Sequence, residues 1–242
     1  MVTFPARRAS FSSIVYEALR EKIILMEIPP GARLSENILA ETLNVSRSPV
    51  REALKLLEQE RLVMTIPQRG TFVTKIVPKE VLDACDMRLL LEEWMLKKLE
   101  AGVAHIDRDV VARLLAEHET IDGAHELSRS LDLDNMFHKT LLESTDNQQA
   151  IRLYLQVITV MIRVRTWNIR RLDTLQKGMD EHRLLYQAIC ERNWELAGNV
   201  ILCHVDAVRK CLRRLEEENP DFCSDDGIIQ EIGGLDCLAG RI

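Results

Sequence analysis

The chain has 242 residues, 46% of them hydrophobic and 29% charged, and its formal net charge is −6. This is the composition of a globular protein with one large domain or two small ones. We expect no secretory signal, because no apolar segment follows Arg7 and Arg8. We also expect no membrane span, because the most apolar stretch, residues 153–164, is too short and too polar. The six cysteines form no C-x-x-C pair typical of a zinc ribbon or disulfide framework, so we expect a cytoplasmic protein.

The charge is unevenly spread along the chain. Residues 1–75 hold 11 Lys and Arg against 8 Asp and Glu, a net charge of +3, which leaves −9 for the remainder. A basic head on an acidic body predicts that only the head meets an anionic partner.

The first predicted element is a helix that begins at a cap on Ser12 or Ser13 and runs to about Met26. Its expected apolar face consists of Ile14, Leu19, Ile23 and Ile24. The segment IPPGARL (residues 28–34) then breaks the chain, because Pro-Pro-Gly cannot continue a helix.

A second and a third short helix follow this break. Ser35 caps the second, and Asn44 ends it because asparagine tolerates a left-handed backbone. Its expected inward residues are Ile38, Leu39 and Leu43. Ser46 or Ser48 caps the third, whose first turn holds Pro49 at no cost in hydrogen bonding. Its expected core residues are Val50, Leu54 and Leu57, and it ends near Glu60.

Residues 62–76 predict a β-hairpin with Gly70 in the turn, and everything from Lys79 to about Glu218 predicts long amphipathic helices. The fold class is therefore mainly α. We expect a winged helix-turn-helix over residues 1–77, an all-helical domain over 78–218 and a disordered tail over 219–242.

In a winged helix-turn-helix the third helix enters the DNA major groove by its N-terminal end. Arg47 and Arg51 lie one turn apart at that end, where guanidinium groups can contact guanine O6 and N7 or phosphate. The alternative is that Arg47 and Arg51 are ordinary solvated residues of a surface helix. The helix spacing, the proline and the basic hairpin tip together favour DNA binding instead. The predicted DNA-binding residues are Ser46, Arg47, Ser48, Arg51, Arg69 and Gly70.

Four side chains in the helical body favour a metal site. Asp134 and His138 share one apolar helix face, and His182 and His204 each lie on an apolar face of a later helix. If the three faces converge, one carboxylate and three imidazoles suit Zn²⁺, with Ni²⁺ or Mn²⁺ as alternatives. Taken singly, each histidine is more often a hydrogen-bonded core residue. The remaining histidines, His105, His118 and His125, are expected to be solvated.

The head resembles the DNA-binding domain of GntR-type bacterial transcription regulators. The resemblance covers about residues 13–75 and is carried by PPGARLSENILAETLNVSRSPVREALKLLEQERLV followed by QRGTFV. It implies that Ser46, Arg47, Arg51 and the wing glycine Gly70 contact operator DNA. Two positions depart from the family pattern: Asn37 stands where some relatives carry an arginine, and Arg61 replaces a usual glycine before the first wing strand.

The body resembles the all-helical FCD domain of the FadR-type branch of that family. The pattern D-x-x-x-H, then H, then H implies that Asp134, His138, His182 and His204 hold a divalent metal at the floor of an effector pocket. In MRLLLE (residues 87–92), the resemblance implies that Arg88 reaches into the pocket and shares a carboxylate effector with the metal. The alternative for Arg88 is an internal ion pair with Glu92 or Asp134.

These features together predict a metabolite-controlled repressor that binds double-stranded operator DNA of dyad symmetry as a homodimer. RLSEN, SRSPVREALK and DMRLLLE are similar to the gluconate-operon repressor group, which implies a sugar-acid effector, with a short-chain carboxylic acid as the alternative. Two other functions stay open. One is a metal-dependent hydrolase, although no additional carboxylate is placed as a general base and no glycine-rich substrate loop is present. The other is a constitutive DNA binder with a purely structural metal.

Overall fold

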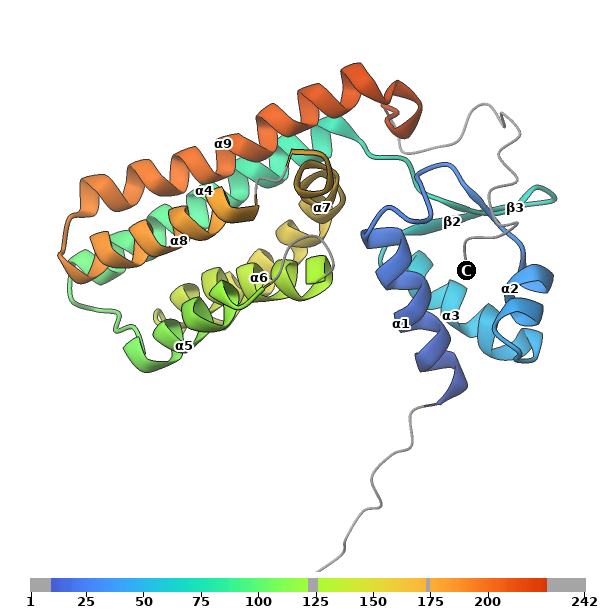
Figure 1. Cartoon of the computed structure of the whole chain (residues 1–242), viewed down its shortest axis with the longest axis horizontal. Coiled ribbons are helices and arrows are strands. Elements are labelled where there is room, and N and C mark those ends of the chain that lie inside the picture. Colours follow the sequence, from blue (N-terminus) through green and yellow to red (C-terminus); the bar gives the residue numbers. More distant parts are fainter. Residues whose placement is uncertain (1–9, 122–125, 173–174, 226–242) are drawn as a thin grey trace, which may run out of the picture. The chain divides into compact units, whose positions relative to one another are not determined.

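The computed structural model describes residues 10–121, 126–172 and 175–225. The chain divides into two compact units, which are described separately below (Figure 1). Unit 1, the head, is Met1–Ile76 with Asp221–Ile242, and unit 2, the body, is Val77–Pro220. None of the helices within the described ranges has the length and apolar character needed to cross a membrane.

The head contains α1 (Phe11–Ile24), α2 (Glu36–Thr42) and α3 (Arg47–Gln59), as predicted. Serine side chains cap the first two helices. Ser10 accepts a hydrogen bond from the N–H of Ser13, so the cap of α1 lies two or three residues before the predicted Ser12 or Ser13. Ser35 accepts from the N–H of Ile38, as predicted for the cap of α2. These helices bury a shared core whose members include Val15, Leu19, Leu39, Leu54 and Leu57.

Two predicted core positions of the head were wrong. Ile14 is 54% exposed and Ile38 is 44% exposed. In α1 the buried stripe instead includes Val15, one residue later, followed by Leu19 and Ile23 at helical spacing. In α2, a helix of only seven residues, the buried positions are Leu39 and Ala40.

The sheet of the head has three antiparallel strands in the order β1–β3–β2: β1 (Arg33–Leu34), β2 (Val63–Ile66) and β3 (Gly70–Val73). The turn of the hairpin is Ile66 to Arg69, closed by the hydrogen bond from Arg69 N–H to the Ile66 carbonyl. Gly70 therefore does not lie in the turn as predicted. It is the first residue of β3 and pairs with Ile66.

The body is built from α-helices alone in the described residues: α4 (Pro78–Glu100), α5 (Arg108–Glu119), α6 (Leu127–Glu143), α7 (Gln148–Leu172), α8 (Leu175–Cys190) and α9 (Trp194–Glu218). Helix α4 packs against both α7 and α9, α8 packs along α9, and α6 packs against α5 and α7 (Figure 1). Their apolar faces meet in a core that contains Met95, Phe137, Leu141, Tyr154 and Leu185.

A short segment follows α9. The 3₁₀-helix η2 (Pro220–Phe222) leads to a parallel β-bridge between Cys223 and Ile76. The N–H of Ile76 donates to the carbonyl of Phe222, and the N–H of Ser224 donates to the carbonyl of Ile76. The C-terminal segment thus completes the hydrogen bonding of the last residue of the head. The remainder of the predicted tail, residues 226–242, lies outside the described residues.

Candidate metal centre and nucleic-acid interface

The N-terminal end of α3 presents polar side chains on one side and core residues on the other. Val50, Leu54 and Leu57 are at most 5% exposed. Ser46 is the residue before the helix, and Arg47, Ser48 and Arg51 are all exposed. Two cationic side chains and free backbone N–H groups therefore lie at one helix start, which is the arrangement that binds phosphate or base edges.

The two arginines of α3 differ in their surroundings. Arg51 Nη2 donates to Glu36 Oε2 over 2.8 Å, and Arg51 Nε lies 3.2 and 3.3 Å from the two carboxylate oxygens. For Arg47, the described residues provide no hydrogen bond or ion pair. The side chain of Arg51 is nevertheless 59% exposed, so it remains open to a ligand.

The wing is formed by β2, β3 and their turn. Arg69 is exposed in the turn, where the preceding Gln68 has the positive φ of 64° that such a turn requires. Gly70 has φ of 114°, and a Cβ atom there would lie 3.3 Å from Nε of Arg33 on the adjacent strand. The backbone conformation therefore favours glycine at this position, and a larger residue would also push the Arg33 side chain aside. Arg33 adds a cation beside the wing that sequence analysis did not identify.

Both departures from the family pattern lie in the head. Arg61, which replaces a usual glycine after α3, has φ of 58°. The non-glycine residue thus still takes the left-handed conformation that ends the helix. Asn37 is exposed on α2, one residue after Glu36.

In the body, the four predicted metal ligands converge. Asp134 and His138 on α6, His182 on α8 and His204 on α9 each offer a ligand atom, and all four atoms lie within 4.8 Å of one another. Nε2 of His182 lies 3.1 Å from Nε2 of His138 and 3.3 Å from Oδ1 of Asp134. Nε2 of His204 lies 3.8 Å from the same oxygen. A tetrahedral ion with bonds of about 2.0–2.1 Å places its ligand atoms about 3.3–3.4 Å apart. The distances from His182 to His138 and Asp134 are close to this spacing, and the distance from His204 to Asp134 is somewhat wider.

Further polar residues surround this donor set. His204 Nδ1 is 2.8 Å from Glu181 Oε2, and His138 Nδ1 is 3.3 Å from Glu92 Oε1. Arg165 on α7 pairs with Asp134 Oδ2 and donates to Asn135 Oδ1 over 2.8 Å. The Glu181 carboxylate on the outer nitrogen of His204 turns its Nε2 atom toward the centre and makes this imidazole a better ligand. Glu181 and Arg165 were not predicted as part of this site, because only the folded chain places them beside the ligands.

The protonation states of the centre also suit a cation. Burial opposes the charge of Asp134, but Arg165 and His182 outweigh burial and hold the pKa of that carboxyl well below its usual range. Burial lowers the pKa of His138 to about 3 even though Glu92 acts in the opposite direction, and burial also lowers the pKa of His182. At neutral pH Asp134 is therefore a carboxylate, and His138 and His182 are neutral imidazoles, which is the state that binds metal.

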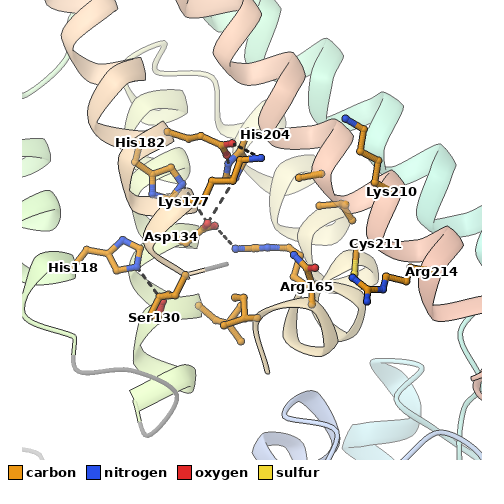
Figure 2. Close-up of a pocket in the computed structure, with 18 residues that line it drawn as sticks. His118, Ser130, Asp134, Arg165, Lys177, His182, His204, Lys210, Cys211 and Arg214 are labelled. Carbon is orange, nitrogen blue, oxygen red and sulfur yellow. Dashed lines mark hydrogen bonds and ion pairs between the residues drawn. The ribbon is translucent and has the colours of Figure 1, made fainter. Parts of the chain in front are cut away.

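A cavity of about 290 Å³ opens beside the centre (Figure 2). Asp134, His182 and His204 line it, whereas His138 does not. Its cationic lining residues are Arg165, Lys177, Lys210 and Arg214, and its anionic ones are Asp134 and Glu181. In Figure 2 the Arg165 guanidinium points at Asp134. Four cationic side chains against two carboxylates give the lining of this cavity an excess of positive charge.

Arg88 does not line this cavity. It is completely buried on α4, and its Nε donates to Glu92 Oε1 over 2.7 Å. The alternative of an internal ion pair with Glu92 is therefore the contact that the structure contains. Nη1 and Nη2 of Arg88 have no hydrogen-bond partner among the residues that the structure describes.

The expectation that His118 is solvated was wrong. His118 is 4% exposed, lines the cavity from α5, and its Nε2 is 3.0 Å from Oγ of Ser130 (Figure 2). Burial, and then the nearby His182, lower its pKa, so the ring is neutral at pH 7. His105 is exposed as expected, and His125 lies outside the described residues.

Comparison with known proteins identifies both units. Residues 11–73 match the family model of bacterial regulatory proteins of the gntR family, and residues 83–207 match the FCD domain model. A transcriptional regulator of Streptomyces ambofaciens, described as uncharacterized and as HTH-type in an unstable DNA locus, is 31% identical over 88% of this chain and 89% of its own length. The chain belongs to the GntR family and carries an FCD domain.

Other members of the GntR family support this assignment. The gluconate operon transcriptional repressor of Bacillus subtilis is 29% identical over 77% of this chain and 79% of its own length. A crystal structure of a putative GntR transcriptional regulator from Rhodococcus sp. RHA1 covers 85% of this chain at 25% identity, with a TM-score of 0.67 and 99% of that chain aligned. This GntR-family chain is therefore a DNA-binding transcription regulator, and the enzyme alternative is excluded because its relatives are regulators.

Proposed function

We propose that this GntR-family regulator is a metal-dependent, metabolite-responsive repressor that acts as a homodimer. The observation that carries the proposal is the Asp134, His138, His182 and His204 cluster at the edge of a cavity with four cationic side chains. A sensor of this kind needs a pocket that binds a small molecule and a separate surface that binds DNA. The two units supply one each.

The DNA-binding part rests on the exposed polar side chains of α3 and the wing. Arg47 and Arg51 reach base edges or phosphates of the major groove, while Ser46 and Ser48 donate hydroxyls to phosphates. Arg69 and Gly70 bring the wing close to the DNA backbone. One winged helix covers only a half-site, so we infer a dyad-symmetric operator.

The homodimer is supported by exposed apolar side chains on the body. Helices α4 and α7 pack against each other. Their large exposed apolar residues are Leu82, Met87, Leu90, Leu153, Leu155 and Val160. A second copy of the chain would bury them. Sedimentation velocity of Leu90→Glu tests this: a monomer is expected, and a dimer unchanged from wild type would contradict the assigned interface.

We assign Zn²⁺ to the centre, because three imidazoles and one carboxylate form a typical zinc ligand set. When bound, the ion supplies a fixed positive charge that polarises an anionic ligand. Asp134 and the three histidines would hold it, and Glu181 would orient His204. Metal analysis of the purified protein tests this assignment, and nickel or manganese on the same ligands would contradict zinc.

The effector that fits this cavity is a small carboxylate. Arg165 and Lys210 offer cationic groups to the acid, and the neutral His118 with Ser130 offers a hydrogen-bonding wall to hydroxyl groups. These groups together favour a sugar acid, in keeping with the gluconate operon repressor among the relatives. Because Arg88 already faces Glu92 and lies outside the lining, we assign the anion contact to Arg165 instead.

An effector alters DNA binding only if its affinity differs between the DNA-bound and DNA-free states. The experiment is a thermal-shift screen of sugar acids and short-chain acids, with zinc and with a chelator, followed by operator titration at saturating ligand. Stabilisation should follow RT ln(1 + [L]/Kd) and require the metal. Stabilisation that is unaffected by the chelator would contradict the metal-linked pocket, and an effector that leaves operator affinity unchanged would contradict the regulatory role.

A further inference from the structure

Glu36 connects the two helices of the helix-turn-helix. It is the first residue of α2, where the Ser35 cap fixes the backbone and an acidic side chain is favoured by the helix dipole. Its carboxylate contacts Arg51 of α3 through Nη2 at 2.8 Å and through Nε at 3.2 and 3.3 Å. Glu36 thus binds one edge of the guanidinium, the edge formed by Nε and Nη2.

This contact leaves the other edge of the guanidinium free. A guanidinium has five N–H donors in a fixed plane, so occupying Nε and one hydrogen of Nη2 leaves Nη1 and the second hydrogen of Nη2 side by side. In the part of the chain that the structure covers, Nη1 of Arg51 has no partner. Two parallel donors are the geometry that pairs with O6 and N7 of guanine.

Arg47 lacks such a partner. It is exposed one turn before Arg51, and its side chain makes no ion pair with any described residue. The hydrogen bond from Arg51, and further the charge of Arg47, lower the pKa of Glu36, so the carboxylate stays ionised. Arg51 is therefore preorganised, while Arg47 must be ordered when DNA binds.

We propose that Glu36 is a positioning residue for base recognition: it aims the free edge of Arg51 at a guanine and so sets sequence specificity. The inference rests on the proposed DNA-binding role of Arg51. It assigns base reading to Arg51 and phosphate binding to Arg47.

This role has a signature that a merely structural residue does not produce. The Glu36 carboxylate is an anion beside the DNA-binding arginines, so it lowers affinity for any DNA through repulsion by the phosphates. Glu36→Gln should therefore raise non-specific affinity and lower discrimination at one base pair. Because the pair lies at the surface, with Arg51 59% and Glu36 34% exposed, its loss should leave the fold intact.

The experiment uses the full chain and a duplex selected from a random-sequence pool by the wild-type protein. Fluorescence anisotropy then gives Kd for that duplex, for its single-base-pair variants and for a random duplex of equal length. For Glu36→Gln we expect discrimination at one G·C pair to fall by about 3- to 10-fold, part of what a bidentate contact carries. Glu41→Gln, an exposed acid on the same helix without an ion-pair partner among the described residues, removes the same charge and should leave discrimination unchanged.

A double-mutant cycle separates the base-reading role of Arg51 from the positioning role of Glu36. In an Arg51→Ala background, Glu36→Gln should have no further effect on discrimination. If Arg51→Ala retains wild-type discrimination, the DNA-reading assignment of α3 fails. If Arg51→Ala loses discrimination but Glu36→Gln does not, or if Glu36→Gln acts equally with and without Arg51, only the positioning role is overturned.

Discussion

The buried Arg88–Glu92 pair on α4 allows a sharp prediction about stability. The two side chains are 0% and 1% exposed, and their Nε and Oε1 atoms are 2.7 Å apart. Glu92→Gln keeps the shape of the side chain but leaves the guanidinium buried without a counter-charge. Removal of one partner from a buried ion pair costs about 3–5 kcal/mol, so we expect the free energy of unfolding to fall by that amount.

Helix α4 also provides a matched control. Lys79 and Asp83 have the same i, i+4 spacing and a comparable distance of 2.6 Å, but their side chains are 79% and 57% exposed. Water already solvates both charges, so Asp83→Asn should cost only about 0–1 kcal/mol. The comparison isolates burial, because helix and spacing are the same.

The assay is urea unfolding followed by circular dichroism, with a chelator present so that metal binding contributes nothing. For m-values of about 1–3 kcal/mol/M, Glu92→Gln should lower the midpoint by at least about 1 M. The double variant Arg88→Met, Glu92→Leu should lie close to wild type, because it removes both charges. Equal midpoints for Glu92→Gln and Asp83→Asn would refute this reasoning.

Three further predictions concern the metal centre and the wing. His182→Ala should abolish metal binding, measured by mass spectrometry of dialysed protein, and should also abolish the rise in Tm that the metal causes. A metal content equal to that of the wild type would exclude His182 as a ligand. Gly70→Ala should lower head stability by about 1 kcal/mol or more in thermal unfolding, because φ is 114° and the new Cβ meets Arg33; an unchanged Tm would show that the strand adjusts. Burial lowers the pKa of His138 in the folded chain from 6.5 to about 3, so the unfolded chain binds this proton at a higher pH than the folded chain does. The free energy of unfolding of the metal-free protein should therefore fall by up to about 1.4 kcal/mol per pH unit as the pH falls from 6.5 toward 3. Equal urea midpoints at pH 7.5 and 5.5 would contradict this prediction.

The helices of the head could be predicted because their ends carry local signals. Ser35, Asn44 and Pro49 act through the backbone of their own turn, and the structure agrees with each. Strand β1 was missed because two residues contain no periodicity. Arg33 and Leu34 become a strand only by pairing with β3, which lies far along the chain.

The convergence of the four candidate metal ligands was also predictable, since each lies on an apolar face that must turn inward. The surrounding residues were harder to predict. His118 stands in a helix with many charged residues, RDVVARLLAEHE, and its burial arises from contact with Ser130 on α6. Glu181 and Arg165 are identified only by distances between helices, which no single segment of sequence contains.

The β-bridge between Ile76 and Cys223 has a consequence for the order in which the chain folds. During synthesis the three helices and the hairpin of the head emerge first, but the N–H and carbonyl of Ile76 find their partners only when Phe222 and Ser224 have been made. A head expressed alone ends with those two groups open to water. Translation must therefore pass Ser224 before Ile76, the last residue of the first domain's N-terminal part, has both of its backbone partners.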